Sequence, residues 1–254
     1  MTPVRHPYLD HPSPIPFAHR GGAADGIENT AAAFRRAAAL GFRYFETDVH
    51  TTADGRLVAF HDTTLDRVTD LRGRISELPW SEVSRARVGG GEPLPLFEDL
   101  LAEFPDARWN VDMKAEPALH PLINLIARTN SWDRVCVGSF SEARVARAHR
   151  LAGPRLATSY GVRGVLGLRL RSYGAPVPVR QGAVCAQVPP DQSGVRVVDE
   201  RFVRTAHARG LQVHVWTIND ADRMRALLDL GVDGIMTDQL ETLRSVFIER
   251  GVWH

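Results

Sequence analysis

Eight short apolar runs divide this chain, and most of them are followed by a segment with the pattern of an amphipathic helix. The runs begin at residues 15, 43, 108, 135, 155, 183, 212 and 234. The intervening pattern predicts helices over 30–40, 97–104, 119–129, 142–151, 200–209, 220–230 and 240–250. Strands that alternate with helices form parallel sheets, and eight of them match a (β/α)8 TIM barrel better than an open doubly wound sheet.

Two segments fall outside this alternation. Residues 1–13 are polar and rich in proline, so we expect an N-terminal arm that lies over the surface of a barrel spanning 14–254. The span 51–95 contains the turn signals T-A-D-G and V-G-G-G-E-P and no long helical pattern. It is predicted to be a small insertion after the second strand, and long insertions of this kind are usually functional.

Two acidic residues close the second predicted strand. Glu46 and Asp48 are two residues apart and therefore point to the same side of the strand. Side by side they repel each other unless they share a proton or hold a cation, and a hard divalent ion is the simpler solution. Asp112, near the end of the third strand, is the natural third ligand, since oxygen donors suit Mg²⁺ or Ca²⁺. Surface salt bridges made by Glu46 and Asp48 are the alternative.

Two histidines also close strand-like runs. His19 ends the first strand, and His61 ends the extended piece after the T-A-D-G turn. Histidine exchanges protons near neutral pH, so the two form a candidate acid and base pair. Arg20 adds a forked cation that suits a phosphate. Lys114 shares a strand face with Asp112, and a solvated lysine is its alternative interpretation.

Composition excludes several other classes of protein. Lys and Arg number 31 against 30 Asp and Glu, so no electrostatic argument favours a nucleic-acid partner. The two cysteines, Cys136 and Cys185, are far apart in sequence and form no metal-binding motif, which favours a reducing, cytoplasmic location. The proline-rich N-terminus does not resemble a signal peptide, and no apolar run approaches the roughly 20 residues of a membrane-spanning helix.

Several spaced motifs, taken in order, carry a family resemblance over residues 15–243. They include H-R-G-G, E-N-T, E-x-D-V, V-x-F-H-D, N-V-D-M-K, V-x-V-W-T-I-N and G-V-D-G-I-M-T-D. In this order they resemble the glycerophosphodiester phosphodiesterase family. The resemblance implies a TIM barrel that hydrolyses glycerophosphodiesters to glycerol 3-phosphate and an alcohol with one bound divalent cation, Mg²⁺ or Ca²⁺.

The resemblance also implies a role for each site residue. It assigns catalysis to His19 and His61, substrate binding to Arg20, Lys114 and Trp216, and the metal to Glu46, Asp48 and Asp112. Trp216 would line the pocket that holds the glycerol. The third carboxylate is more often Glu in the family, and Asp112 is one methylene shorter. The substrate would be the small-molecule partner; the sequence does not indicate an oligomeric state.

Two alternative functions stay open at this point. One is a lysophospholipase D or sphingomyelinase D type of activity, which needs an apolar groove at the barrel mouth. The stretch V-L-G-L-R-L at 165–170 is the candidate for that groove. The other is a catalytically silent barrel that binds phosphodiesters, although such a protein would be free to lose His19, His61 or the carboxylates.

Several further residues are assigned lesser roles. Asn29 or Thr30 is predicted to cap the first helix, with Asn29 preferred, while Glu28 could hydrogen-bond to the loop after the first strand. Gln187 ends the sixth strand and is placed near the pocket. His214 is expected to be a packed residue of the barrel interior.

Overall fold

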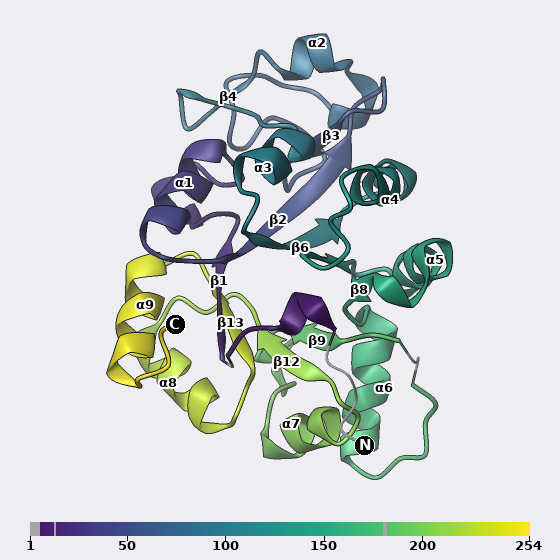
Figure 1. Cartoon of the computed structure of the whole chain (residues 1–254), viewed down its shortest axis with the longest axis vertical. Coiled ribbons are helices and arrows are strands. Elements are labelled where there is room, and N and C mark those ends of the chain that lie inside the picture. The colour runs from purple at the N-terminus through teal and green to yellow at the C-terminus, as the bar shows by residue number, and fades with distance from the viewer. Residues whose placement is uncertain (1–5, 13, 180–181) are drawn as a thin grey trace.

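The chain folds into a barrel of parallel strands surrounded by helices, seen in a computed structural model that describes residues 6–12, 14–179 and 182–254 (Figure 1). The barrel strands are β1 (Ile15–His19), β2 (Tyr44–Thr51), β6 (Arg108–Met113), β7 (Val135–Gly138), β8 (Ala157–Thr158), β9 (Cys185–Val188), β12 (Gln212–Val215) and β13 (Gly234–Thr237). They pair in the order β8-β7-β6-β2-β1-β13-β12-β9. A parallel bridge between Ser159 and Cys185 joins the two ends. The predicted (β/α)8 barrel is confirmed.

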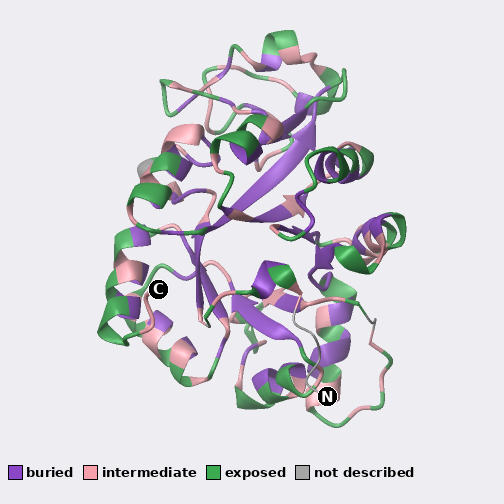
Figure 2. Cartoon of the chain, in the orientation of Figure 1, coloured by how far each residue is buried: buried purple, intermediate pink, exposed green. Residues whose placement is uncertain are grey.

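Helices cover the outside of these strands. They are α1 (Ala31–Ala39), α3 (Phe97–Glu103), α4 (Leu119–Arg128), α5 (Glu142–Ala152), α6 (Val162–Ser172), α7 (Glu200–His207), α8 (Ala221–Asp229) and α9 (Leu240–Glu249). Figure 2 shows the strands buried and the helices buried only on their inner faces. Short polar side chains start several helices, for example Ser141, Asp199 and Asp220, each of which accepts a backbone N–H of the first turn.

The insertion after β2 has a small core of its own. Within it lie β3 (Leu57–Ala59), α2 (Trp80–Val83), β4 (Arg87–Val88) and β5 (Glu92–Pro93). Strand β3 runs antiparallel to β2, and Val58, Phe60, Leu65 and Ile75 are buried together beneath the loops. This packing fixes the segment that carries His61.

The N-terminal segment differs from the expected surface arm. In its described part, a 3₁₀ turn at Pro7–Leu9 buries Tyr8 and Leu9 against Ile15, Phe17 and Tyr44. Tyr44 Oη donates to the carbonyl of Tyr8 at 2.6 Å. These partners lie at the start of the strands, so the turn closes the N-terminal end of the barrel. The sequence pattern missed this because two apolar residues among prolines give no periodic signal.

Candidate active site

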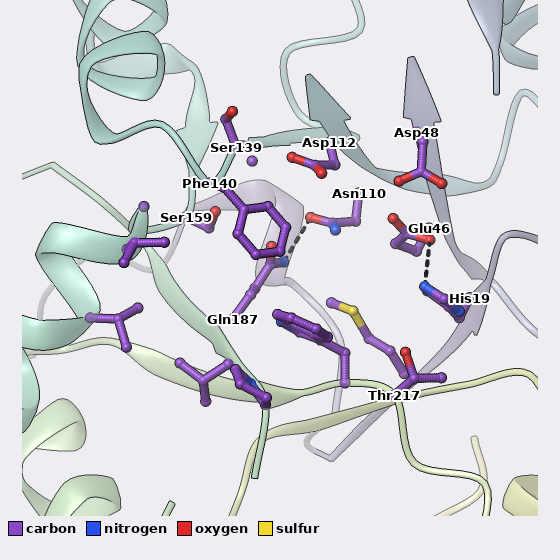
Figure 3. Close-up of a pocket in the computed structure, with 18 of the residues that line it drawn as sticks. His19, Glu46, Asp48, Asn110, Asp112, Ser139, Phe140, Ser159, Gln187 and Thr217 are labelled. Atoms are coloured by element: carbon purple, nitrogen blue, oxygen red, sulfur yellow. Dashed lines mark hydrogen bonds and ion pairs between the residues drawn. The ribbon is translucent and has the colours of Figure 1, made fainter. Parts of the chain in front are cut away.

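A cavity of about 420 Å³ opens at the C-terminal ends of the strands. This end of a TIM barrel is where active sites are built, because the loops that follow the strands converge there. Figure 3 shows Glu46, Asp48 and Asp112 pointing into this cavity, with the ring of Phe140 in it as well. The structure brings all the predicted site residues together here: His19, Arg20, Glu46, Asp48, His61, Asp112, Lys114 and Trp216.

Glu46 and Asp48 are buried side by side on β2. Glu46 Oε2 accepts the backbone N–H of Arg20 at 3.1 Å. Burial, together with the charge of Asp48, raises the pKa of Glu46 to about 7. Burial would also raise the pKa of Asp48, but the nearby charges of Lys114 and Arg20 hold it below its usual value. The surface salt bridges considered as an alternative are excluded, because only 5% of Glu46 and 1% of Asp48 is exposed.

Lys114 links the two strands that carry the carboxylates. Its Nζ lies 2.8 Å from Asp48 Oδ1 and 2.7 Å from Asp112 Oδ2. Burial opposes its charge, but these two carboxylates outweigh that effect and raise the pKa of Lys114. Lys114 is therefore a buried cation of the site rather than a solvated lysine. Within the described residues, no three His, Cys, Asp or Glu side chains form a group that could hold a metal ion.

Each histidine has a carboxylate partner that the sequence did not reveal. His19 Nδ1 donates to Asp238 Oδ1 at 2.7 Å, and His61 Nδ1 donates to Asp62 Oδ1 at 2.6 Å. Such a partner fixes the ring orientation and leaves Nε2 as the reactive nitrogen. Burial acts to lower the pKa of His19, but the charges of Glu46 and Asp238 outweigh it and raise the pKa.

Further contacts hold the His61 loop in place. Arg67 Nε donates to Asp62 Oδ2 at 2.5 Å, and the same arginine reaches Glu28 at 2.7 Å. His50 places its Nε2 at 3.1 Å from the carbonyl oxygen of His61. The loop is thus tied both to β2 and to the segment before α1.

The position of the Arg20 side chain is fixed by its backbone conformation and by the carboxylates of Glu28 and Asp48. Its φ is 53°, in the left-handed region, and Gly21 follows with a φ of 79°. A Cβ on Gly21 would lie 2.8 Å from the Cβ of Ala33, so only glycine fits there. Arg20 Nη1 donates to Glu28 at 3.0 Å, as expected, and Nε lies 3.2 Å from Asp48 Oδ2. The guanidinium is fixed at the cavity wall.

Asn29 has a different role from the predicted cap. Thr30 caps α1, since its Oγ1 accepts the N–H of Ala33 at 3.2 Å. Asn29 instead donates from Nδ2 to Asp48 Oδ2 at 3.1 Å and accepts from Thr47. The Thr30 alternative is therefore confirmed and the preference for Asn29 was wrong, because cap propensity alone cannot distinguish two adjacent polar residues.

The remaining assignments agree with the structure. Gln187 lines the cavity and donates to Asn110 Oδ1 at 2.7 Å. His214 is fully buried, with its ring centroid 4.9 Å from that of Phe17.

Asp62 and Asp238 were not predicted from the sequence. Asp62 directly follows His61, and Asp238 directly follows Thr237, the last residue of β13. A carboxylate at a strand end was the signal that could have found them.

The Asp238→Asn variant should lower the pKa of His19. The variant removes one of the two negative charges that stabilise the imidazolium, so protonation needs a lower pH. An NMR titration of the metal-free protein measures this directly. Asp229→Asn, in an exposed carboxylate that pairs with Arg250, is the control. An unchanged His19 titration in Asp238→Asn would contradict the charge assignment.

The fold and the site together define a class of protein: TIM-barrel enzymes that act on phosphate esters. Paired imidazoles, buried carboxylates and two fixed cations at the barrel mouth are the groups that phosphoryl chemistry requires. Residues 19–242 match the glycerophosphoryl diester phosphodiesterase family, and the chain belongs to that family. It is therefore a phosphoric diester hydrolase, and its substrate is a small glycerophosphodiester.

Known relatives agree with this assignment. The Mycobacterium tuberculosis protein named "Probable glycerophosphodiester phosphodiesterase 2" is 43% identical over 251 residues, which cover 97% of this chain and 95% of the relative. A glycerophosphodiester phosphodiesterase from Agrobacterium tumefaciens superposes with a TM-score of 0.76 at 22% identity, covering 91% of this chain and 98% of that one.

A third similar protein was solved with a ligand. It is a phosphodiesterase from Oleispira antarctica in complex with the product sn-glycerol-3-phosphate, with a TM-score of 0.76 at 22% identity. The match covers 93% of this chain and 97% of that one. At this identity the two structures support the barrel fold.

Among the described residues, no helix is both long enough and apolar enough to cross a bilayer.

Proposed function

We propose that the chain hydrolyses glycerophosphodiesters to glycerol 3-phosphate and an alcohol with His19 and His61 as the acid and base pair and with one divalent cation. The observation that carries the proposal is the pairing of each imidazole with its own carboxylate, at 2.7 Å for His19 and 2.6 Å for His61, in one cavity. Two groups oriented in this way can remove and deliver protons at opposite ends of a phosphodiester.

The cation would be held by Glu46, Asp48 and Asp112. All their donors are oxygens, which suit Mg²⁺ or Ca²⁺. Burial, together with the charge of Asp48, raises the pKa of Glu46, so a cation beside the pair would stabilise its charged form. Asp112 lies beside Asp48 in the strand register, and Lys114 Nζ contacts both carboxylates; because the three acids do not converge as a ready-made site among the described residues, binding the cation would require their side chains to turn toward one another. When bound, the cation supplies positive charge that stabilises the phosphorane-like transition state.

The protein side chains have two separate roles in the proposed reaction: some neutralise the charge of the substrate, and others transfer protons. Arg20 and Lys114 offset the negative charge of the phosphodiester. One histidine removes the proton of the glycerol hydroxyl next to the phosphate, and that oxygen attacks phosphorus. The other histidine protonates the departing alcohol. The resulting cyclic phosphate opens with water as the two histidines exchange roles, and glycerol 3-phosphate is released.

Incubation with glycerophosphocholine tests the reaction. Purified protein with Mg²⁺ or Ca²⁺ should release glycerol 3-phosphate and choline in equal amounts, measured with a coupled dehydrogenase assay and by mass spectrometry. A panel of other head groups, assayed in the same way, tests generality. The absence of glycerol 3-phosphate with every metal and head group would contradict the proposed function.

Chelation should abolish this activity, and the cation should stabilise the folded protein. A ligand present at 100 times its Kd stabilises the native state by about 2.7 kcal/mol. The melting temperature should therefore rise when Mg²⁺ or Ca²⁺ is added to chelated protein, and Asp48→Asn should remove most of that rise. Asp229→Asn, an exposed carboxylate substitution, should keep it. Full activity in rigorously chelated protein would contradict the metal assignment.

We also propose a cytoplasmic location. Cys136 and Cys185 are free, fully buried thiols on strands β7 and β9 that contact each other inside the barrel. Free thiols in contact are typical of a reducing compartment. Fractionation of cells that express the tagged protein tests this location.

A further inference from the structure

A second cavity lies between helices α6 and α7, on the outside of the barrel. The two helices lie side by side (Figure 1), and the cavity has a volume of about 560 Å³. Pockets of this size bind small molecules. We call this cavity the arginine groove, because its lining includes Arg171, Arg201, Arg204 and Arg209. Among the described residues, no carboxylate lines it, and none of its lining residues also lines the catalytic cavity.

The arginines of the groove lack the acidic partners that many other surface arginines have. Elsewhere on the helices, carboxylates pair with Arg35, Arg128, Arg225 and Arg250. In the groove, Arg204 pairs with Glu200 of the same helix. No carboxylate in the described part of the chain forms an ion pair with Arg171, Arg201 or Arg209. The groove therefore holds an excess of positive charge.

Helix α7 and the turn after it supply most of this charge. Arg201 and Arg204 are three residues apart and share a helix face, and Arg209 follows two residues after the helix ends. The helix dipole favours a cation near the C-terminal end, but it disfavours Arg201, which is in the first turn. Helix stability therefore does not account for the position of Arg201.

Arg171 lines the groove from the end of α6. Its Nη1 donates to the carbonyl of Val177 at 2.6 Å, which holds the guanidinium in place and uses one of its five N–H groups. Arg171 and Arg209 are only partly exposed, so both cations lose part of their hydration without gaining a carboxylate. An anion in the groove would supply the missing partner.

The arginines of α7 and its following turn are spread along the helix axis. At about 1.5 Å of rise per residue, Arg201 and Arg209 are roughly 12 Å apart along the axis, with Arg204 between them. A single phosphate cannot contact all three. Linked phosphates can, because arginine side chains are long and each phosphate offers several oxygens to the forked guanidinium.

We propose that the arginine groove is a binding site for a small soluble anion with two or three linked phosphate groups. Pyrophosphate, tripolyphosphate and the phosphate chain of a nucleotide have this chemistry. The inference is independent of the proposed reaction, because the groove and the catalytic cavity are separate. A nucleic acid fits the surface less well, since 31 basic residues are balanced by 30 acidic ones over the whole chain.

Isothermal titration calorimetry of the whole chain, dialysed against buffer without divalent cations, tests the inference. Tripolyphosphate should bind, and inorganic phosphate should bind about tenfold more weakly or worse because it reaches fewer arginines. Citrate, whose negative charges are on carboxylates, should also bind more weakly than tripolyphosphate. The affinity for tripolyphosphate should fall as NaCl is added, because salt screens exposed charges.

Two variants show where the anion binds. Arg201→Gln and Arg209→Gln each remove one cation of the groove and should weaken tripolyphosphate binding by about tenfold. Neither substitution leaves a described carboxylate without its partner, so the melting temperatures should stay unchanged. Arg163→Gln is the matched control, because Arg163 is an exposed arginine on α6 that lines neither cavity. Its binding should be unchanged.

The titrations have clear contrary outcomes. A protein that does not bind tripolyphosphate would overturn the inference. Equal binding by all three variants would also overturn it, because the anion would then lie elsewhere, for example in the catalytic cavity. Equal weakening in all three would point to net charge rather than to the groove. Phosphate or citrate binding as tight as that of tripolyphosphate would overturn the ligand class.

A vesicle sedimentation assay distinguishes a soluble ligand from a lipid head group. Phosphatidylcholine vesicles that contain phosphatidylglycerol should sediment no more protein than vesicles of phosphatidylcholine alone. Sedimentation that is lost in Arg201→Gln and Arg209→Gln but kept in Arg163→Gln would overturn the assignment of a soluble ligand, because the groove would then be a membrane contact.

Discussion

The His61→Ala variant should hydrolyse glycerophosphocholine with a kcat about 10²–10⁴-fold below that of the unchanged protein. The imidazole is held by Asp62 at 2.6 Å in the catalytic cavity, and alanine can neither accept nor deliver a proton. Steady-state kinetics at saturating substrate measure the loss.

The fold should survive this substitution. Asp62 keeps its ion pair with Arg67 when the imidazole is gone, so no buried charge is left without a partner. The melting temperature is therefore expected to stay within a few degrees of the original. His120→Ala, in an exposed histidine on α4, is the matched control and should be fully active. An unchanged rate in His61→Ala would show that the acid and base pair is misassigned.

The largest expected effect on stability comes from Trp109→Ala. Trp109 is fully buried on β6 and forms T-shaped ring pairs with three phenylalanines. The distances between ring centroids are 4.9 Å to Phe34, 5.2 Å to Phe45 and 5.5 Å to Phe97. Removing a buried tryptophan side chain costs about 3–5 kcal/mol through lost burial and the cavity left behind. At roughly 2–4 °C per kcal/mol for a chain of this size, the melting temperature should fall by about 6–20 °C.

Calorimetry and urea titration measure this loss. Trp109→Phe keeps an aromatic ring in the cluster and should lose less stability. Trp80→Ala, at the start of α2 and only partly buried, is the exposure control. A loss below about 1 kcal/mol in Trp109→Ala would mean that this aromatic cluster does not support β6.

The sequence predicted the barrel because its signals are local. Each strand is a short apolar run, and most of the helices have an amphipathic pattern, so the alternation can be recognised without knowing which segments touch; α6 (Val162–Ser172) was not predicted as a helix. The same holds for Glu46, Asp48 and His19, which mark strand ends. Strand ends converge in a barrel, so the site followed from the fold.

The contacts that orient the site could not be predicted in this way. His19 and Asp238 are 219 positions apart and meet only because β1 pairs with β13. Lys114 was recognised, yet nothing in the pattern indicated that its ammonium would bind Asp48 and Asp112 at once. Such contacts depend on side-chain directions after the barrel has closed, which periodicity does not encode.

The pairing of β1 with β13 has a consequence for the order in which the site is assembled during translation. β1 is made before the other barrel strands, and β13, which completes its hydrogen bonding, is made after them. Until then one edge of β1 stays open, and an open edge is prone to pair with other chains. His19 therefore gains its Asp238 partner only after β13 has been made, and a nascent chain stalled before β13 would carry an incomplete proton-transfer pair.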